Sequence, residues 1–307
     1  MPFLSGALDL VVAEKVLSAA LGTLEVKSAS LVRYRAGRRA LISYNLTDSE
    51  RFGSLIVLGK IRARGTDERS HAVQSELHEA GFPVPRTLGL VPEFSMWLQE
   101  NIVGVEATAL LGGNEGLLVA ADSARLVKRL HGSGVKPRRK PHTLADEIGV
   151  LEERLPLVVA RRPELAGRIE RLLGGSRKLA CGIKEPEAKT GIHRDFYQDQ
   201  VLFAEDSPYL LDLDLYCEGD PALDAGNFLA HIAEQSLREH DDPAALSSLG
   251  DAFLGEFVGG EEELAERVSL YRTLTLVRHV WISDRIPARQ TFTPEILALC
   301  EELLAGE

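Results

Sequence analysis

Residues 191–203, which read GIHRDFYQDQVLF, are the stretch of this sequence that decides the fold. YLLDLD follows at 209–214, and GDPALD at 219–224. The apolar runs 201–203 and 209–213 predict a buried hairpin that brings the polar residues at its two ends together. Phosphoryl transfer needs a carboxylate beside the attacking hydroxyl and oxygen ligands that hold Mg²⁺ against the phosphates. Asp195, Gln200 and Asp212 supply such groups in that order.

The first hundred residues are predicted to be mainly strand. Gly81, Pro83 and Pro85 end a polar helix at 67–80. Hydrophobic periodicity predicts a further helix before it and strands on both sides of it. The expected strands are Leu24–Tyr34, Ala40–Leu46, Ser54–Ile61, Thr87–Val91 and Ser95–Gln99, and the expected helices are Leu8–Leu21 and Asp67–Ala80.

The pattern changes near Asn101, and from Glu106 onward most of the chain is predicted to be helix. We therefore predict an α+β chain with a β-rich lobe at 1–101 and a mainly helical lobe at 102–307, in the outline of a protein-kinase-like two-lobe fold. The expected helices are Leu117–Leu130, Leu144–Val159, Pro163–Leu173, Pro221–Leu237, Ala244–Val258, Glu261–Ile282 and Pro294–Leu304.

Composition restricts the class of protein. A net charge of -11 over 307 residues argues against nucleic-acid binding, and it is compatible with a cationic substrate. The N-terminal stretch lacks the pattern of a signal peptide, and no apolar run is long enough to span a bilayer. Three widely spaced cysteines predict neither a zinc site nor a disulfide framework. A cytoplasmic protein without a membrane partner is expected.

The decisive stretch resembles the active-site signature of the aminoglycoside phosphotransferase and choline kinase-like superfamily. The resemblance extends from about Leu31 to about Ile232. Upstream, it is carried by ASLVRYRAGRRALISYNL at 29–46 and LIVLGKI at 55–61, which are similar to the family's first hairpin and lysine-bearing strand. It continues through GFPVPRTLGL at 81–90, WLQENIVG at 97–104 and LVKRLHGSG at 126–134.

This resemblance implies ATP and Mg²⁺ as cofactors and a role for each matching residue. Asp195 would accept or orient the proton of the substrate hydroxyl, and Gln200 and Asp212 would hold the metal. Lys60 would contact the α- and β-phosphates and pair with an acid on the following helix. His193 and Asp224 would brace the catalytic loop. The adenine would contact backbone groups of Gln99, Glu100, Asn101 and Ile102.

The sequence departs from the family pattern at two places in the loop. Gln200 stands where most relatives have Asn, which puts the metal geometry in question. Arg194 replaces the usual Gly, giving an HRD triplet like that of protein kinases. A GxGxxG loop, a DFG triplet and an APE-bounded activation segment are missing from the sequence. The sequence therefore favours a small-molecule kinase over a protein kinase.

Several assignments remain open at this point. The acid partner of Lys60 is expected to be Glu68, with Glu76 as the alternative. Asp214 is either a second metal ligand or a solvent-facing residue of the hairpin. Arg35, Arg38 and Arg39 either reach the phosphates or are exposed turn residues.

The predicted reaction is transfer of the ATP γ-phosphate to a hydroxyl of a small molecule: an aminoglycoside, a sugar or aminosugar, or an amino alcohol. The substrate is expected between the helices 144–159 and 163–173 and the catalytic loop. One alternative is a nucleotide-binding pseudokinase in which Gln200 marks lost metal geometry. The other is a metal-dependent phosphohydrolase built from His193, Asp195, Asp212 and Asp214. The sequence does not indicate an oligomeric state.

Overall fold

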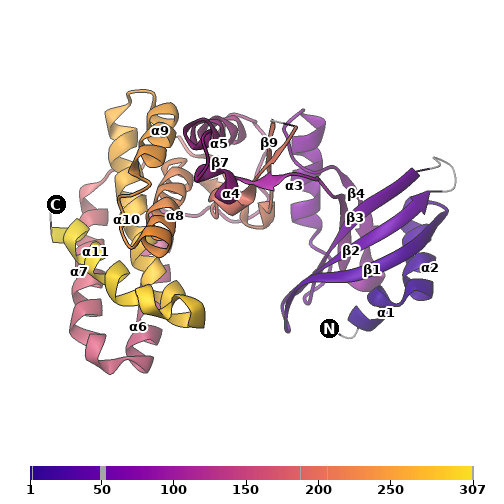
Figure 1. The fold of residues 1–307 in the computed structure, drawn as a ribbon, viewed down its shortest axis with the longest axis horizontal. Coiled ribbons are helices and arrows are strands. Elements are labelled where there is room, and N and C mark those ends of the chain that lie inside the picture. The colour runs from indigo at the N-terminus through magenta and orange to yellow at the C-terminus, as the bar shows by residue number, and fades with distance from the viewer. Residues whose placement is uncertain (2, 49–52, 187, 206, 306–307) are drawn as a thin grey trace. The chain divides into compact units, whose positions relative to one another are not determined.

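The protein is represented by a computed structural model that describes all residues except 2, 49–52, 187, 206 and 306–307 (Figure 1). The chain divides into two compact units. The first comprises Met1–Gly104 together with Tyr209–Asp214, and the second comprises Val105–Pro208 and Leu215–Glu307. The expected hairpin therefore contributes its last residues, Asp212 and Asp214 among them, to the β-rich unit.

The first unit is built on a five-stranded antiparallel sheet in the order β1-β2-β3-β5-β4. Strands lie at every predicted place. Their bounds are β1 (Leu24–Arg35), β2 (Arg39–Asp48), β3 (Gly53–Arg62), β4 (Thr87–Val91) and β5 (Met96–Glu100).

One face of this sheet carries the core of the first unit. Tyr44, Ile61 and Leu98 are buried there in one apolar cluster with Leu17 of the N-terminal helices. The single helix expected at 8–21 is in fact two helices, α1 (Leu4–Leu8) and α2 (Leu10–Leu21). The break occurs because Asp9 is extended and its carboxylate accepts a hydrogen bond from the N–H of Val12 at 3.0 Å, which caps α2.

The opposite face of the sheet presents Lys60, because successive side chains of a strand point to opposite sides. Lys60 and Trp97 are cross-strand partners in β3 and β5. The ring of His71, on α3 (Glu68–Glu79), lies edge-on to the Trp97 ring with 5.8 Å between centroids. α3 begins where predicted because the Asp67 carboxylate accepts a hydrogen bond from the N–H of Ser70. This face therefore carries the predicted site residue Lys60.

The second unit is mainly helical, as predicted. Its long helices are α5 (Gly116–His131), α6 (Leu144–Arg161), α7 (Ala166–Gly182), α8 (Ala222–His240), α9 (Ser247–Val258), α10 (Glu262–Arg285) and α11 (Thr293–Ala305), and a short helix α4 (Ala107–Leu111) precedes them. In Figure 1, α6, α7, α10 and α11 form the end of the unit that holds the C-terminus.

Small strands hold the catalytic loop within the second unit. β7 (Thr190–Ile192) pairs antiparallel with β10 (Cys217–Gly219), and β6 (Val105–Glu106) pairs with β8 (Val201–Ala204). β9 (Ser207–Leu210) follows β8 and leads into the 209–214 segment of the first unit. The hairpin was expected, whereas β6, β7 and β10, each of two or three residues, were not.

α7 corrects one predicted boundary. The prediction ended this helix at Leu173, but the helix continues through Gly174 and Gly175 to Gly182. Packing explains the difference: a Cβ at Gly175 would lie 3.1 Å from Cδ1 of Leu304, so the glycine allows α11 to approach closely. This close packing offsets the unfavourable helix propensity of glycine.

Gly226 allows a still closer contact between α8 and α10. A Cβ at this position would lie 2.6 Å from the backbone nitrogen of Arg272, and 2.6 Å from Cβ of Tyr271. Because a backbone atom cannot move aside as a side-chain end can, glycine is required here.

No helix in the described part of the chain is long and apolar enough to cross a membrane.

Candidate active site

The predicted catalytic loop runs from the end of β7 to the start of β8 and exposes two carboxylates, those of Asp195 and Asp199. His193 and Phe196 are fully buried, whereas Asp195 between them is exposed. The Phe196 ring stacks on Phe228 of α8 with 5.6 Å between centroids. Since residues on both sides of Asp195 are anchored in the core, its carboxylate is presented to solvent from a fixed backbone.

Asp224, in the first turn of α8, holds this loop through its backbone. One carboxylate oxygen accepts a hydrogen bond from the N–H of Arg194 at 2.6 Å, and the other accepts one from the N–H of His193 at 2.8 Å. His131 of α5 lies 2.8 Å from the second oxygen through its Nε2. The Asp224 side chain is fully buried, and its place in the structure is the bracing place that the sequence suggested.

Arg194 adopts a backbone conformation that favours glycine. Its φ is 71°, in the left-handed region, where a side chain other than glycine is strained. The Gly usual in relatives at this position would carry no such strain. The Arg194 carbonyl accepts a hydrogen bond at 2.8 Å from the side-chain amide of Asn227. Asn227 and Asp224 therefore hold both ends of the Arg194 backbone unit.

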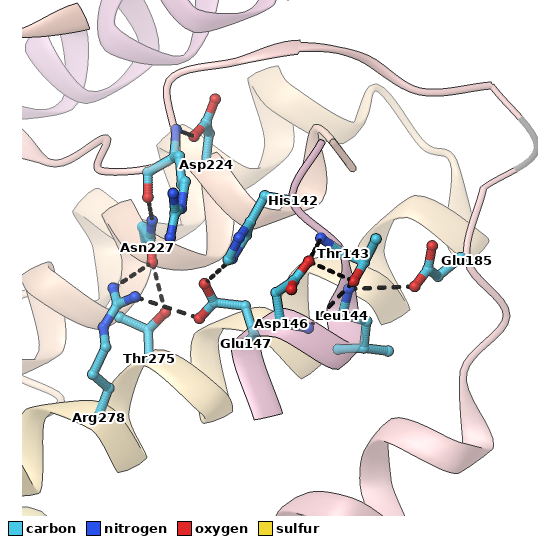
Figure 2. A network of polar contacts seen from close by, with 11 residues as sticks. His142, Thr143, Leu144, Asp146, Glu147, Glu185, Asp224, Asn227, Thr275 and Arg278 are labelled. Atoms are coloured by element: carbon cyan, nitrogen blue, oxygen red, sulfur yellow. Dashed lines mark hydrogen bonds and ion pairs between the residues drawn. The ribbon is translucent and has the colours of Figure 1, made fainter. Parts of the chain in front are cut away.

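Behind the loop lies a network of buried polar side chains (Figure 2). The Asn227 carbonyl oxygen accepts hydrogen bonds from Thr275 at 2.6 Å and Arg278 at 3.0 Å. Arg278 also donates to Glu147 at 3.4 Å, and Glu147 is paired at 2.6 Å with His142. The network connects α6 and α10 to the loop.

Burial alone would raise the pKa of the Glu147 carboxyl, but the charge of Arg278 and the hydrogen bond with His142 outweigh it, so the pKa is lowered. Glu147 is therefore a charged carboxylate inside the protein. This network was not predicted from the sequence. Arg278 interrupts the apolar helical run LTLVRHV, and a charge inside such a run indicates a buried partner.

Gln200 ends a short 3₁₀ turn that begins at Gln198. Its side chain is 9 % exposed, and its N–H donates to the carbonyl of Tyr197 at 2.9 Å. The neighbouring Gln198 donates to Gln235 of α8 at 2.8 Å, which fixes the turn on the helix. Asp199 is exposed and accepts a hydrogen bond from Thr108. Gln200 is thus held in an ordered turn, as a metal ligand needs to be.

The first unit contains a pocket on the Lys60 face of its sheet, with about 400 Å³ of open space. Lys60 and Asp212 both line it, so the structure brings together two of the predicted site residues. The Lys60 ammonium lies 4.8 Å from the Trp97 ring centre. Burial lowers the pKa of Lys60, and the nearby Asp212 carboxylate opposes that shift. The full lining is Arg33, Arg39, Ala40, Leu41, Lys60, Ile61, Arg62, Asp212 and Asp214.

Arginines surround the two carboxylates of this pocket. Nη1 of Arg39 lies 3.4 Å from an oxygen of Asp214 and 3.7 Å from one of Asp212. Arg62 forms an ion pair with Asp214, and its Nε lies 4.0 Å from Asp67. Asp214 is 8 % exposed. Asp214 is therefore a buried partner of arginines and not a solvent-facing residue.

Glu68 is the acid that the sequence analysis expected as the partner of Lys60. Glu68 is exposed in the first turn of α3, and Glu76 is half-buried two turns further along. The carboxylates that raise the pKa of Lys60 are Asp212 first and Asp67 after it. The structure thus favours Asp212 over Glu68 as the acid beside the lysine.

The segment 99–102, expected to face the adenine, is partly engaged within the sheet. The N–H of Glu100 donates to Arg86 and that of Asn101 to Ile56. The buried Gln99 side chain accepts a hydrogen bond from Gln74 at 3.2 Å. These two N–H groups are therefore used within the first unit and are not free to contact a nucleotide.

Within the described residues, no group of three or more His, Cys, Asp and Glu side chains could hold a metal ion. Mg²⁺ is commonly bound by one or two protein oxygens together with substrate phosphates and water. Asp212, in the first unit, and Gln200, in the second, offer the oxygen donors that this metal prefers.

Solved structures that are similar to this chain include small-molecule kinases. A spectinomycin phosphotransferase, in complex with ADP and spectinomycin, superposes with a TM-score of 0.61 at 13% identity, covering 95% of each chain. A choline/ethanolamine kinase family protein from Mesorhizobium loti gives 0.59 at 17% identity, with 90% of this chain and 88% of that one covered. An amicoumacin kinase gives 0.59 at 15% identity, with 89% and 88% covered. The fold is therefore the protein-kinase-like fold of these enzymes.

The family itself is shown by sequence. The model of the phosphotransferase enzyme family matches residues 59–267, about two thirds of the chain. The chain therefore belongs to the phosphotransferase enzyme family. The match includes Lys60, the catalytic loop and the segment 209–224. No curated protein matches the sequence.

Proposed function

We propose that this protein transfers the γ-phosphate of ATP to a hydroxyl of a small molecule in a Mg²⁺-dependent reaction. The observation that carries the proposal is Asp195: an exposed carboxylate on a loop whose flanking residues are buried and whose backbone is held by Asp224. A general base must be presented in this way, since it has to reach a substrate proton from a fixed position.

Asp195 accepts or orients the hydroxyl proton while the oxygen attacks the γ-phosphorus. The bond from that phosphorus to the β,γ-bridging oxygen breaks, and ADP leaves. Lys60 would neutralise phosphate charge, and Asp212 and Gln200 are the residues that would hold the metal. The metal ion, when bound, supplies charge stabilisation at the phosphates.

The acceptor is expected to be an aminoglycoside, a sugar or aminosugar, or an amino alcohol. Structurally similar proteins act on such compounds, as their names state: spectinomycin, choline or ethanolamine, and glucosamine. The nucleotide is inferred from the family and from relatives solved with ADP or AMP-PNP. The cytoplasm is the expected compartment, because ATP is available there and the cysteines are free.

An ADP-release assay over a panel of aminoglycosides, sugars and amino alcohols tests the proposal. Wild-type protein is compared with Asp195→Asn, and Glu218→Gln serves as the control because Glu218 is an exposed carboxylate on β10. We expect acceptor-dependent ADP release that falls at least about 100-fold in Asp195→Asn and persists in the control. Turnover that survives in Asp195→Asn would overturn the role of this residue.

The same assay decides between the kinase and its alternatives. Nucleotide binding without ADP release for any acceptor would favour the pseudokinase. Phosphate release from a monoester in the absence of ATP would favour the phosphohydrolase.

A further inference from the structure

Arg39 and Arg62 lie directly opposite one another on β2 and β3. Like charges at such positions repel each other and destabilise a sheet. Here the repulsion is offset by an acid, because the Asp214 carboxylate is ion-paired with both arginines. The arrangement is therefore two guanidinium groups held side by side by one buried carboxylate.

The pocket that contains them has an excess of positive charge. Lys60, Arg33, Arg39 and Arg62 line it as cationic side chains, against two acidic ones, Asp212 and Asp214. The chain as a whole has a net charge of -11, so this local balance is opposite to that of the protein. A cationic, partly enclosed pocket favours an anionic ligand. Arginine is well suited to phosphate oxygens because its planar guanidinium donates two parallel hydrogen bonds.

The contacts of the two acids differ. Arg39 is closer to Asp214, at 3.4 Å, than to Asp212, at 3.7 Å, and Arg62 pairs with Asp214 and with Asp67. Asp214 is thus the acid engaged by both arginines. Asp212 is the acid beside Lys60, and it has a left-handed backbone with a φ of 57°.

We propose that Arg39 and Arg62 bind the phosphates of the nucleotide, and that Asp214 is the counter-ion that positions these arginines and not a second metal ligand. This inference rests on the proposed function, because it concerns the nucleotide of that same reaction. It assigns the two acids of the LDLD segment to different tasks: Asp212 faces the metal, and Asp214 faces the arginines.

Binding of ADP in the presence of EDTA, measured by isothermal titration calorimetry, tests the arginines without any catalytic turnover. We expect Arg39→Met and Arg62→Met each to weaken metal-free ADP binding by at least about tenfold, since each removes a charged hydrogen bond to phosphate. Arg64→Met is the matched control, because Arg64 follows β3 closely but is exposed and outside the pocket. Affinities unchanged in both pocket variants would overturn the proposal.

Loss of Arg62 leaves Asp214 buried beside one arginine only, which lowers stability for a reason unrelated to nucleotide. The double variant Arg62→Met/Asp214→Asn removes both charges, and circular dichroism shows whether it is folded. We expect the folded double variant to bind ADP as weakly as Arg62→Met. Recovery of wild-type affinity in the double variant would show that Arg62 only neutralises Asp214, and would overturn the proposal.

The roles of Asp212 and Asp214 are tested by titrating Mg²⁺ and measuring ADP affinity. The quantity compared is the Mg²⁺ concentration at which the gain in ADP affinity is half-maximal. Asp212→Asn is expected to raise it at least about tenfold, and Asp214→Asn to leave it within about twofold of wild type. An equal rise in both variants would make Asp214 a metal ligand and overturn its assignment. If wild-type protein binds neither ADP nor ATP with or without Mg²⁺, the proposed function fails. Nucleotide binding by wild type with no effect of the arginine variants defeats only this inference.

Discussion

The carboxylate of Asp224 accepts a hydrogen bond from the backbone N–H of Arg194 at 2.6 Å, across 30 residues of sequence. Its second oxygen accepts the N–H of His193. A helix residue thereby fixes the backbone immediately before the exposed carboxylate of Asp195. The position of the proposed base depends on an acid that is itself fully buried.

Replacement of Asp224 by alanine should therefore impair both stability and turnover. Two buried N–H groups would lose their acceptor, at a cost of about 1–3 kcal/mol each. We expect the free energy of unfolding to fall by roughly 3 kcal/mol and kcat to fall at least about 100-fold, measured by urea unfolding and ADP release. The control is Glu263→Gln, because Glu263 is an exposed acid in the first turn of α10. Equally small effects in both variants would reduce Asp224 to an ordinary first-turn acid.

The left-handed backbone of Arg194 predicts an inverted order of stability for glycine and alanine. With φ at 71°, Arg194→Gly should be more stable than Arg194→Ala by about 1 kcal/mol, since glycine adopts this region without steric cost. Arg171 is an exposed position within α7, and there Arg171→Ala should be more stable than Arg171→Gly by about 1 kcal/mol. Urea unfolding of the four variants measures both differences. Alanine at least as stable as glycine at position 194 would contradict the assigned backbone conformation.

The close contact between α8 and α10 predicts that Gly226→Ala is destabilising. The added Cβ would meet the Arg272 nitrogen at 2.6 Å, so the helices must separate, at a cost of about 2–3 kcal/mol. Gly255 of α9 is the matched control because a Cβ there meets nothing within 4 Å. Gly255→Ala should raise stability by about 0.5–1 kcal/mol. Thermal unfolding gives both values, and equal signs at the two positions would refute the packing argument.

The buried His279 and the half-buried His231 beside it predict a loss of stability in acid. Burial and the neighbouring Arg278, Arg289 and Arg238 lower the pKa of His279 from 6.5 to about 3, and that of His231 is also lowered, by burial and then by His279. Below pH 6.5 these two histidines therefore become protonated in the unfolded chain, whereas in the folded protein they stay neutral. The free energy of unfolding should therefore fall as pH drops from 6.5 toward 3, by roughly 1 kcal/mol per pH unit for each histidine.

Urea unfolding between pH 7.5 and 4.5 measures this slope. His279→Gln should flatten it, whereas substitution of the exposed His240 by Gln should leave it unchanged. A slope in His279→Gln that equals that of wild type would show that the buried ring is not the source.

The sequence by itself determined the two-lobe fold and the residues that define the family. Strand alternation, helix periodicity and the ordered spacing of Asp195, Gln200 and Asp212 are local patterns, so they can be read without coordinates. The strands of the first unit and most helices lie where those patterns predicted them. The boundaries that failed, at Asp9 and at Gly175, are places where a cap or a packing partner overrode propensity.

Only the tertiary structure decided which charges meet. Asp214 proved to be a partner of Arg39 and Arg62, Asp212 proved to be the acid beside Lys60, and Arg278 proved to support the catalytic loop through Asn227. These pairs join residues tens to more than a hundred positions apart. The sequence does not show which partner a charged side chain will have. An ion pair depends on distance and burial, and these are set only when the strands and helices pack.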